Sequence, residues 1–150
     1  MKIKLSVSDE CYEEIEKKLL SAGFEIDDDA PFVLSQKDSF CSFLSVKSPS
    51  GDKIRLSVKD IIFIESYGHD VIVHATDKVS YQSAERLYQL SAMLDNELFV
   101  RVSNCAIISK SHVKKIKPSI SMKFVLTMSD GSLVDVTRSY YNSFREFFGI

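Results

Sequence analysis

The alternation of apolar and polar residues changes character close to residue 50. Before that point, Lys2–Val7 alternates as a short strand does, and the apolar residues after Ser8 recur at the spacing of an amphipathic helix. Phe32–Leu34 and Ser42–Val46 have the composition of further strands, and the turn residues of Ser48–Asp52 end the segment. Residues 1–48 therefore predict a small α/β layer of the β-α-β-β type.

The remaining two thirds of the chain predict many short strands and two short helices. Ile61–Ile64 and Val71–Ala75 are apolar runs of strand length, and the alternating residues of Met122–Met128 precede a turn and another strand, as in a hairpin. Ser83 begins a helix expected over 84–94, which has leucines at helical spacing. A closing helix carries an aromatic face that we assign to the core, formed by Tyr140, Phe144, Phe147 and Phe148.

Three short polar turns lie between these apolar strands. The first is Glu65–Asp70, the second is Ser103–Cys105, and the third is Thr137–Ser139. The flanking residues suit a core, whereas the turns carry side chains that donate or accept hydrogen bonds. This contrast predicts that the strands hold the turns in place so that the turns can meet a ligand.

The charge is distributed unevenly. The whole chain has a net charge of −2, but residues 1–50 have a net charge of −4, and residues 101–150 hold 8 basic and 3 acidic residues. Segments that differ in sign favour a division of roles in which the basic end faces a polyanion. A basic surface that is only solvated is the alternative on charge alone.

Catalytic and metal-binding motifs are absent from the sequence. It has no nucleophile elbow, no phosphate-binding glycine loop and no HExxH, so we expect no enzyme activity, no catalytic or metal-binding residue and no cofactor. Cys11, Cys41 and Cys105 are odd in number and far apart, which predicts reduced thiols. Asp27–Asp29 is best interpreted as a solvated acidic turn and not as a metal or phosphoacceptor site.

Two histidines and the apolar runs add little further chemistry. His74 is out of phase with its apolar neighbours and is expected to be a partly exposed strand residue, and His112 is expected to face solvent from a turn. No apolar run approaches the roughly 20 residues of a membrane helix, and the N-terminus lacks the core of a signal peptide. These features predict a cytoplasmic protein.

With the three polar turns in this order, the chain resembles the LytTR family of bacterial DNA-binding domains over about residues 51–148. The resemblance is carried by Asp60–Ser66 before the first turn, by Leu98–Asn104 at the second, and by Val136–Tyr141 around the third. It implies that residues 51–150 form a mainly β domain of short antiparallel sheets with two short helices. It also implies that loops, and not a recognition helix, enter successive major grooves of DNA.

The resemblance further implies roles for single residues. His69, Asn104 and Arg138 would read bases, one from each polar turn. Their chemistry suits this task, because arginine can pair with guanine and asparagine with adenine, and histidine can donate to or accept from a base edge. The residues implied as phosphate contacts flank them and are Arg101, Ser103, Lys110 and Ser139.

The partners implied are double-stranded promoter DNA with repeated half-sites, a second copy of the chain in a homodimer, and a membrane-protein regulator. The chain is similar to LytTR regulators that stand alone without a receiver domain. Residues 1–48 would then dimerise or bind a regulator, or only add to the core. Asp70 departs from the pattern, because a carboxylate beside His69 repels the DNA backbone. Asp70 and the negative net charge favour the alternative, a protein-interaction or inhibitory module that does not bind DNA.

Overall fold

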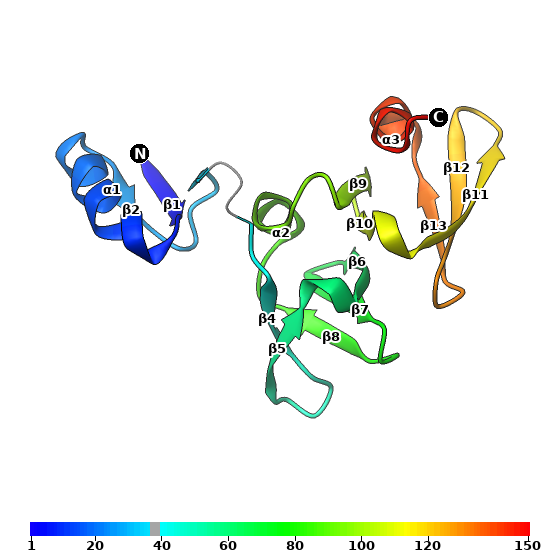
Figure 1. The fold of residues 1–150 in the computed structure, drawn as a ribbon, viewed down its shortest axis with the longest axis horizontal. Helices are drawn as coiled ribbons and strands as arrows, with labels where there is room; N and C mark the ends of the chain where they lie inside the picture. Colours follow the sequence, from blue (N-terminus) through cyan, green and yellow to red (C-terminus); the bar gives the residue numbers. More distant parts are fainter. Residues whose placement is uncertain (37–39) are drawn as a thin grey trace. The chain divides into compact units, whose positions relative to one another are not determined.

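The computed structural model describes residues 1–36 and 40–150, and the chain divides into two compact units, Met1–Phe40 and Cys41–Ile150. Figure 1 shows the helices and strands of each unit. We describe the units separately and call them the first unit and the second unit.

The first unit is a small parallel sheet with one helix. The sheet has the strand order β2-β1-β3, and Ile3 and Leu5 of the central strand are buried. The backbone N–H of Asp29 donates to the Asp27 side chain at 2.9 Å, so the predicted acidic turn is confirmed as a turn. The elements are β1 (Lys2–Ser6), α1 (Asp9–Ser21), β2 (Glu25–Ile26) and β3 (Val33–Ser35).

The second unit is mainly β, as predicted, and contains two antiparallel sheets. The larger sheet has the strand order β5-β4-β8-β7-β6-β10-β9. Its strands are β4 (Phe43–Lys47), β5 (Lys53–Ser57), β6 (Ile61–Tyr67), β7 (Asp70–Ala75), β8 (Ser80–Ser83), β9 (Phe99–Ser103) and β10 (Ala106–Ser109).

The smaller sheet and the helices complete the second unit. The smaller sheet has the order β11-β12-β13, and the hairpin predicted around Met122–Met128 is its β12–β13 pair. The remaining elements are β11 (Val113–Ser119), β12 (Lys123–Met128), β13 (Leu133–Val136), α2 (Leu87–Met93), α3 (Tyr141–Phe148), and the 3-10 turns η1 (Val58–Asp60), η2 (Lys110–His112) and η3 (Arg138–Tyr140).

Strand β6 lies between two hydrophobic cores, which explains why four consecutive residues are apolar. Ile61 and Ile64 pack in the core that includes α2, whereas Ile62 and Phe63 pack in the core formed with the smaller sheet and α3. The β6–β7 register shifts between Ile61 and Phe63, so the strand accommodates one extra residue there. Because both faces of β6 are covered, the first polar turn extends from a strand that is packed on both sides.

The division between the units differs from the sequence expectation. We expected the N-terminal region to end at residue 48, but the division lies after Phe40. The reason is that β4 pairs antiparallel with β5 over its whole length and also with β8, so Phe43–Lys47 belongs to the larger sheet. A local pattern can identify a strand but not the partner with which it pairs.

Two smaller expectations are also corrected. Helix α2 begins at Leu87 and not at Ala84. The Ser83 hydroxyl does accept the backbone N–H of Glu85, but Arg86 has an extended backbone with φ −82° and ψ 163°, so no helix runs on from Ser83. His112 is half-buried and does not simply face solvent. Its ring nitrogens lie 3.0 Å from the Ser129 hydroxyl and 3.1 Å from the backbone carbonyl of Lys59.

Candidate nucleic-acid interface

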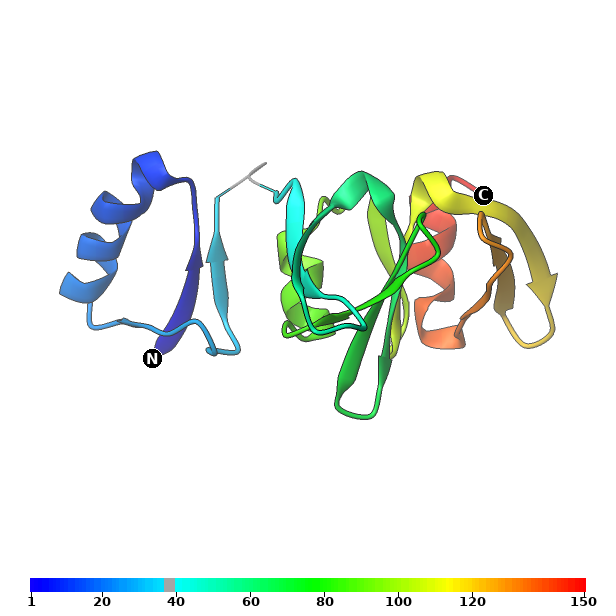
Figure 2. The same cartoon turned by 90° about the horizontal axis from the view of Figure 1, so that it is seen from below.

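The three polar turns lie along one edge of the second unit and are joined by backbone hydrogen bonds. The N–H of Ser66, in the first turn, donates to the carbonyl of Cys105 in the second at 2.8 Å. The N–H of Thr137, which begins the third turn, donates at 2.9 Å to the carbonyl of Val102, just before the second. In Figure 2 the green β6–β7 turn and the orange start of α3 both lie on the lower side of this unit. The second turn is therefore the centre of a continuous row.

The first turn is a two-residue hairpin loop with an exposed histidine at its tip. Tyr67 and Asp70 pair across the loop, and Gly68 supplies the positive φ of 57° that a tight hairpin of this kind requires. His69 is exposed, and its backbone carbonyl accepts a hydrogen bond from Nη1 of Arg86 at 2.8 Å. His69 therefore lies in a turn whose backbone is held by the Arg86 side chain.

Asp70 also has a partner. Its Oδ1 accepts a hydrogen bond from Nε2 of Gln82 on the neighbouring strand β8 at 3.0 Å. Gln82 therefore supplies a hydrogen-bond donor to the carboxylate. The Arg86 guanidinium, bonded to the carbonyl of the adjacent residue, brings a positive charge to the same turn. The repulsion of DNA expected from Asp70 is thus partly offset by groups that are distant in the sequence.

The second turn is held by the side chain of Arg101. Its guanidinium donates to the backbone carbonyls of Ser103 at 3.2 Å and Asn104 at 2.8 Å. The Ser103 hydroxyl accepts the N–H of Cys105 at 3.1 Å, which tightens the turn further. Arg101 and Ser103 therefore shape the turn in the free protein, whereas Asn104 is exposed at its tip.

The third turn connects β13 to α3 and is linked to the second by a side chain. The Tyr140 hydroxyl donates to Oδ1 of Asn104 at 3.0 Å, so the amide orientation of Asn104 is fixed by the element that carries Arg138. Arg138 and Ser139 are exposed. Among the residues that the structure describes, the Arg138 side chain has no hydrogen-bond or ion-pair partner, which leaves its guanidinium donors available to a ligand.

Lys110 is not brought to this edge. Strand β10 separates it from the second turn, and it lies in η2 at the other end of that strand. Its Nζ lies 3.4 Å from the backbone carbonyl of Phe147 and 5.1 Å from the centre of the Phe147 ring. The structure thus assembles six of the seven residues expected to contact DNA and places Lys110 against the end of α3.

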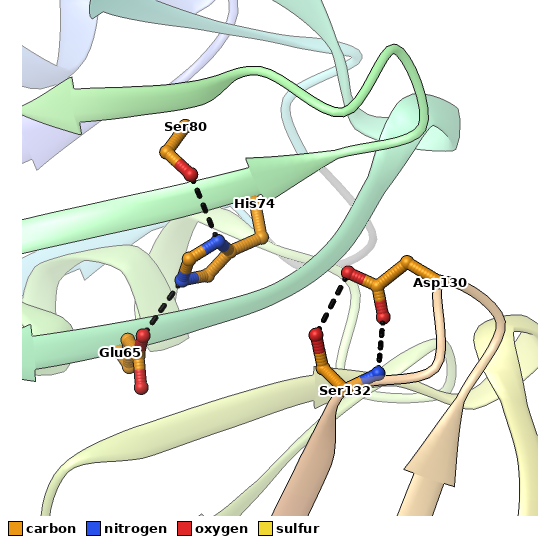
Figure 3. Close-up of polar contacts among 5 residues, drawn as sticks. All are labelled: Glu65, His74, Ser80, Asp130 and Ser132. Atoms are coloured by element: carbon orange, nitrogen blue, oxygen red, sulfur yellow. Dashed lines mark hydrogen bonds and ion pairs between the residues drawn. The ribbon is translucent and has the colours of Figure 1, made fainter.

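A cleft of about 580 Å³ opens between the second and third turns. Glu65 contributes to its wall, and the Glu65 carboxylate lies 2.7 Å from Nε2 of His74, whose Nδ1 lies 3.1 Å from the Ser80 hydroxyl (Figure 3). His74 is half-buried, as predicted, and stacks on Phe63 with ring centroids 4.3 Å apart. The cleft is lined by Glu65, Ser103, Asn104, Cys105, Ala106, Leu133, Val134, Asp135, Thr137 and Ser139.

The β12–β13 turn of the smaller sheet is also closed by side-chain contacts. Figure 3 shows the Asp130 carboxylate accepting hydrogen bonds from both the backbone N–H and the hydroxyl of Ser132, each at 2.9 Å. Gly131 has a φ of 87° at the tip. This turn fixes the start of β13 and so the direction in which the strand enters the third polar turn.

The edge offers a range of hydrogen-bonding chemistry. Arg138 can donate two parallel bonds, Asn104 can donate and accept, and His69 can do either. The cleft between the turns adds carboxylate acceptors, from Glu65 and Asp135. Such a set suits an extended ligand with many donors and acceptors, and base edges in a DNA groove are one such ligand.

Two residues of this site were missed in the sequence. Arg86 lies between a strand and a helix with no periodic signal, and its contact with residue 69 spans 17 positions. Tyr140 was assigned to the aromatic core face, although its hydroxyl holds Asn104. The one available signal was that Tyr140 follows directly after the third polar turn.

Neither a metal cluster nor a membrane-spanning helix is found in residues 1–36 and 40–150. Within those ranges the structure has no cluster of three or more histidine, cysteine, aspartate or glutamate side chains arranged to hold a metal ion. Within the same ranges, no helix combines the length and the apolar character needed to span a bilayer.

Comparison with known proteins identifies the second unit. The family model of the LytTr DNA-binding domain matches residues 52–149. The sensory transduction protein LytR of Staphylococcus epidermidis is 27% identical over 95 residues, which cover 63% of this chain and 37% of that protein. The sensory transduction protein LytT of Bacillus subtilis is 29% identical over 85 residues, or 57% of this chain and 35% of that protein. The transcriptional regulatory protein LytR of Staphylococcus aureus is 25% identical over 100 residues, which cover 66% of this chain and 40% of that protein.

The fold agrees with these sequence matches. A solved LytTr DNA-binding domain from Bacillus cereus superimposes with a TM-score of 0.69 at 24% identity, covering 73% of this chain and 99% of that one. The chain spans less than half the length of the curated relatives that it matches. From residue 52 to residue 149, this chain belongs to the LytTr DNA-binding domain family.

Proposed function

We propose that this chain is a sequence-specific transcriptional regulator whose three polar turns enter successive major grooves of promoter DNA. The observation that carries the proposal is the row of three hydrogen-bonded turns, each of which carries one of the exposed residues His69, Asn104 and Arg138 between paired strands or elements. A rigid backbone matters because base reading depends on placing donors and acceptors to within a fraction of an ångström.

The three residues have different parts in this proposal. Arg138 reads a guanine through paired donors to N7 and O6, and Asn104 reads an adjacent base with an amide oriented by Tyr140. His69 reads a base at the far end of the row. Ser139, exposed beside Arg138, contacts phosphate, and Arg101 and Ser103 act mainly by shaping the second turn.

The test is a binding experiment with duplex DNA. The full chain is titrated against the fragment upstream of its own coding sequence, and against duplexes selected from a random pool, with fluorescence anisotropy at several salt concentrations. Arg138→Ala should cost about 1–3 kcal/mol for the selected sequence and relax the preference at one base pair. Lys59→Ala is the matched control, because Lys59 is an exposed cation at the opposite end of β6. Equal affinity and equal sequence preference for Arg138→Ala would contradict the assignment.

We further propose that the protein binds repeated half-sites as a homodimer, with the first unit dimerising or binding a regulator that is itself a membrane protein. The support is the exposure of apolar residues in the first unit. Helix α1 has no fully buried residue, and Leu20, Phe32 and Leu34 of this unit are substantially exposed. Exposed apolar side chains in a unit of only 40 residues favour a partner.

A protein-interaction module remains the second candidate. Its main support is Asp70, and that support is weakened by the hydrogen bond from Gln82 to the Asp70 carboxylate and by the Arg86 guanidinium on the carbonyl of the adjacent residue. A complex with another protein, together with no DNA binding in the titration above, would favour the module.

A further inference from the structure

We propose that Arg86 forms a further DNA-phosphate contact beside the first polar turn and at the same time holds that turn in position. This inference rests on the proposed function. It extends the DNA-binding surface to the segment between β8 and α2, which none of the three turns includes.

The backbone of Arg86 is fixed at both of its polar atoms. Its N–H donates to the side-chain oxygen of Gln89 at 2.8 Å, and Gln89 is buried, with 6% of its surface exposed. Its carbonyl accepts the N–H of Leu90 at 2.9 Å, at the start of α2. The side chain therefore extends from an anchored position, and ordering it on DNA costs less conformational entropy than ordering a loop.

The strand register brings this segment alongside the first turn. Val71 of β7 pairs with Ser83 of β8, so the residues that follow Ser83 continue next to Asp70 and His69. Nη1 of Arg86 lies 2.8 Å from the carbonyl of His69. An exposed guanidinium thus lies against the backbone of His69, the residue that is proposed to read a base.

The chemistry of the guanidinium leaves capacity for a phosphate. Arginine has five N–H donors in one plane, and within the described ranges the Arg86 side chain has a single hydrogen-bond partner, the His69 carbonyl. The remaining donors can form two parallel hydrogen bonds to the oxygens of a phosphate, as arginine often does. A positive charge there also offsets the Asp70 carboxylate, which by itself would repel the DNA backbone.

The experiment measures the salt dependence of DNA binding for Arg86→Gln, Arg86→Lys and a control, all in the full chain with the selected duplex. Loss of one phosphate contact should make the slope of log affinity against log salt shallower by about 0.9. Equivalently, the advantage of the unsubstituted protein over Arg86→Gln should shrink about 3.5-fold between 50 and 200 mM salt. The selected duplex and an unrelated duplex should be affected alike, and Arg86→Lys should keep the original slope.

Lys59→Gln is the matched control, because it removes one exposed positive charge at the far end of β6. Its slope should equal that of the unsubstituted protein. Amide hydrogen exchange without DNA reports the second role: exchange across residues 66–71 should be faster in Arg86→Gln than in Lys59→Gln.

Three outcomes would overturn the inference. They are an unchanged slope for Arg86→Gln, an equal loss for Lys59→Gln, and unchanged exchange across residues 66–71. If Arg138→Ala still weakens binding while the Arg86→Gln slope is unchanged, the inference fails and the proposed function stands. If the unsubstituted protein binds no duplex, both fail.

Discussion

Single residues on the edge that carries the three polar turns divide into those that shape the backbone and those that remain available to a ligand. Arg101 uses its guanidinium on two carbonyls of the second turn, whereas Arg138 has no such partner among the described residues. The same side-chain type therefore has opposite roles within one site. Sequence reasoning could not separate them, because the difference depends on which carbonyls lie within reach.

The thiols allow a direct test of this edge at the residue scale. Cys105 is exposed in the second turn, whereas Cys41 is half-buried, and burial raises the pKa of the Cys41 thiol. Because the thiolate is the reactive form, Cys41 should be alkylated by iodoacetamide more slowly than Cys105 at pH 8. Bound operator should slow the reaction of Cys105 and leave that of Cys41 unchanged, as measured by peptide mass spectrometry. The same Cys105 rate with and without DNA would place the second turn outside the contact.

At the element scale, helix α3 determines where the third turn points. Phe144 is fully buried, and its ring centroid lies 5.3 Å from that of Phe124 and 4.7 Å from that of Phe148. Phe144→Ala should therefore lower the free energy of unfolding by about 3–5 kcal/mol. It should also weaken DNA binding, because Arg138 lies directly before the helix.

Urea unfolding followed by tyrosine fluorescence measures this change, since five of the six tyrosines lie in the second unit. Leu133→Ala is the control, because Leu133 is 69% exposed on β13 and its loss should change stability by less than about 0.5 kcal/mol. Similar unfolding midpoints for the two variants would show that α3 is not packed as described.

The elements themselves were predictable where a local pattern was strong. Phe124, Leu126 and Met128 alternate with partly exposed neighbours, and all three are buried in β12 as the alternation predicts. The error at the start of α2 came from contacts between residues that are close in the sequence. Ser83 is a good helix cap by residue type, and its hydroxyl accepts the N–H of Glu85. The helix nevertheless starts after the extended residue Arg86, whose N–H the Gln89 side chain accepts, so two neighbouring start positions compete. Periodicity contains no information about such competition between neighbouring side chains.

At the scale of the whole molecule, the position of β4 decides which truncation is informative. Deleting residues 1–40 removes the first unit, whereas deleting residues 1–48 also removes the strand that pairs with β5 and β8. That strand contributes Leu44 and Val46, which are 2% and 4% exposed, to the core with α2. Burial of two such side chains stabilises a core by about 3–6 kcal/mol. Residues 41–150 should therefore unfold cooperatively in urea at a higher midpoint than residues 49–150.

The solved domain from Bacillus cereus supports the shorter truncation. It is matched over 99% of its own length by 73% of this chain. A domain of that size therefore folds without any segment that corresponds to the remaining part of this chain. If the first unit dimerises the protein, sedimentation velocity should give a dimer for the full chain and a monomer for residues 41–150. The monomer should still bind a single half-site, with lower affinity for paired half-sites because the second contact is no longer intramolecular. An unchanged mass would exclude dimerisation by the first unit, and equal stability of the two fragments would contradict the assignment of β4.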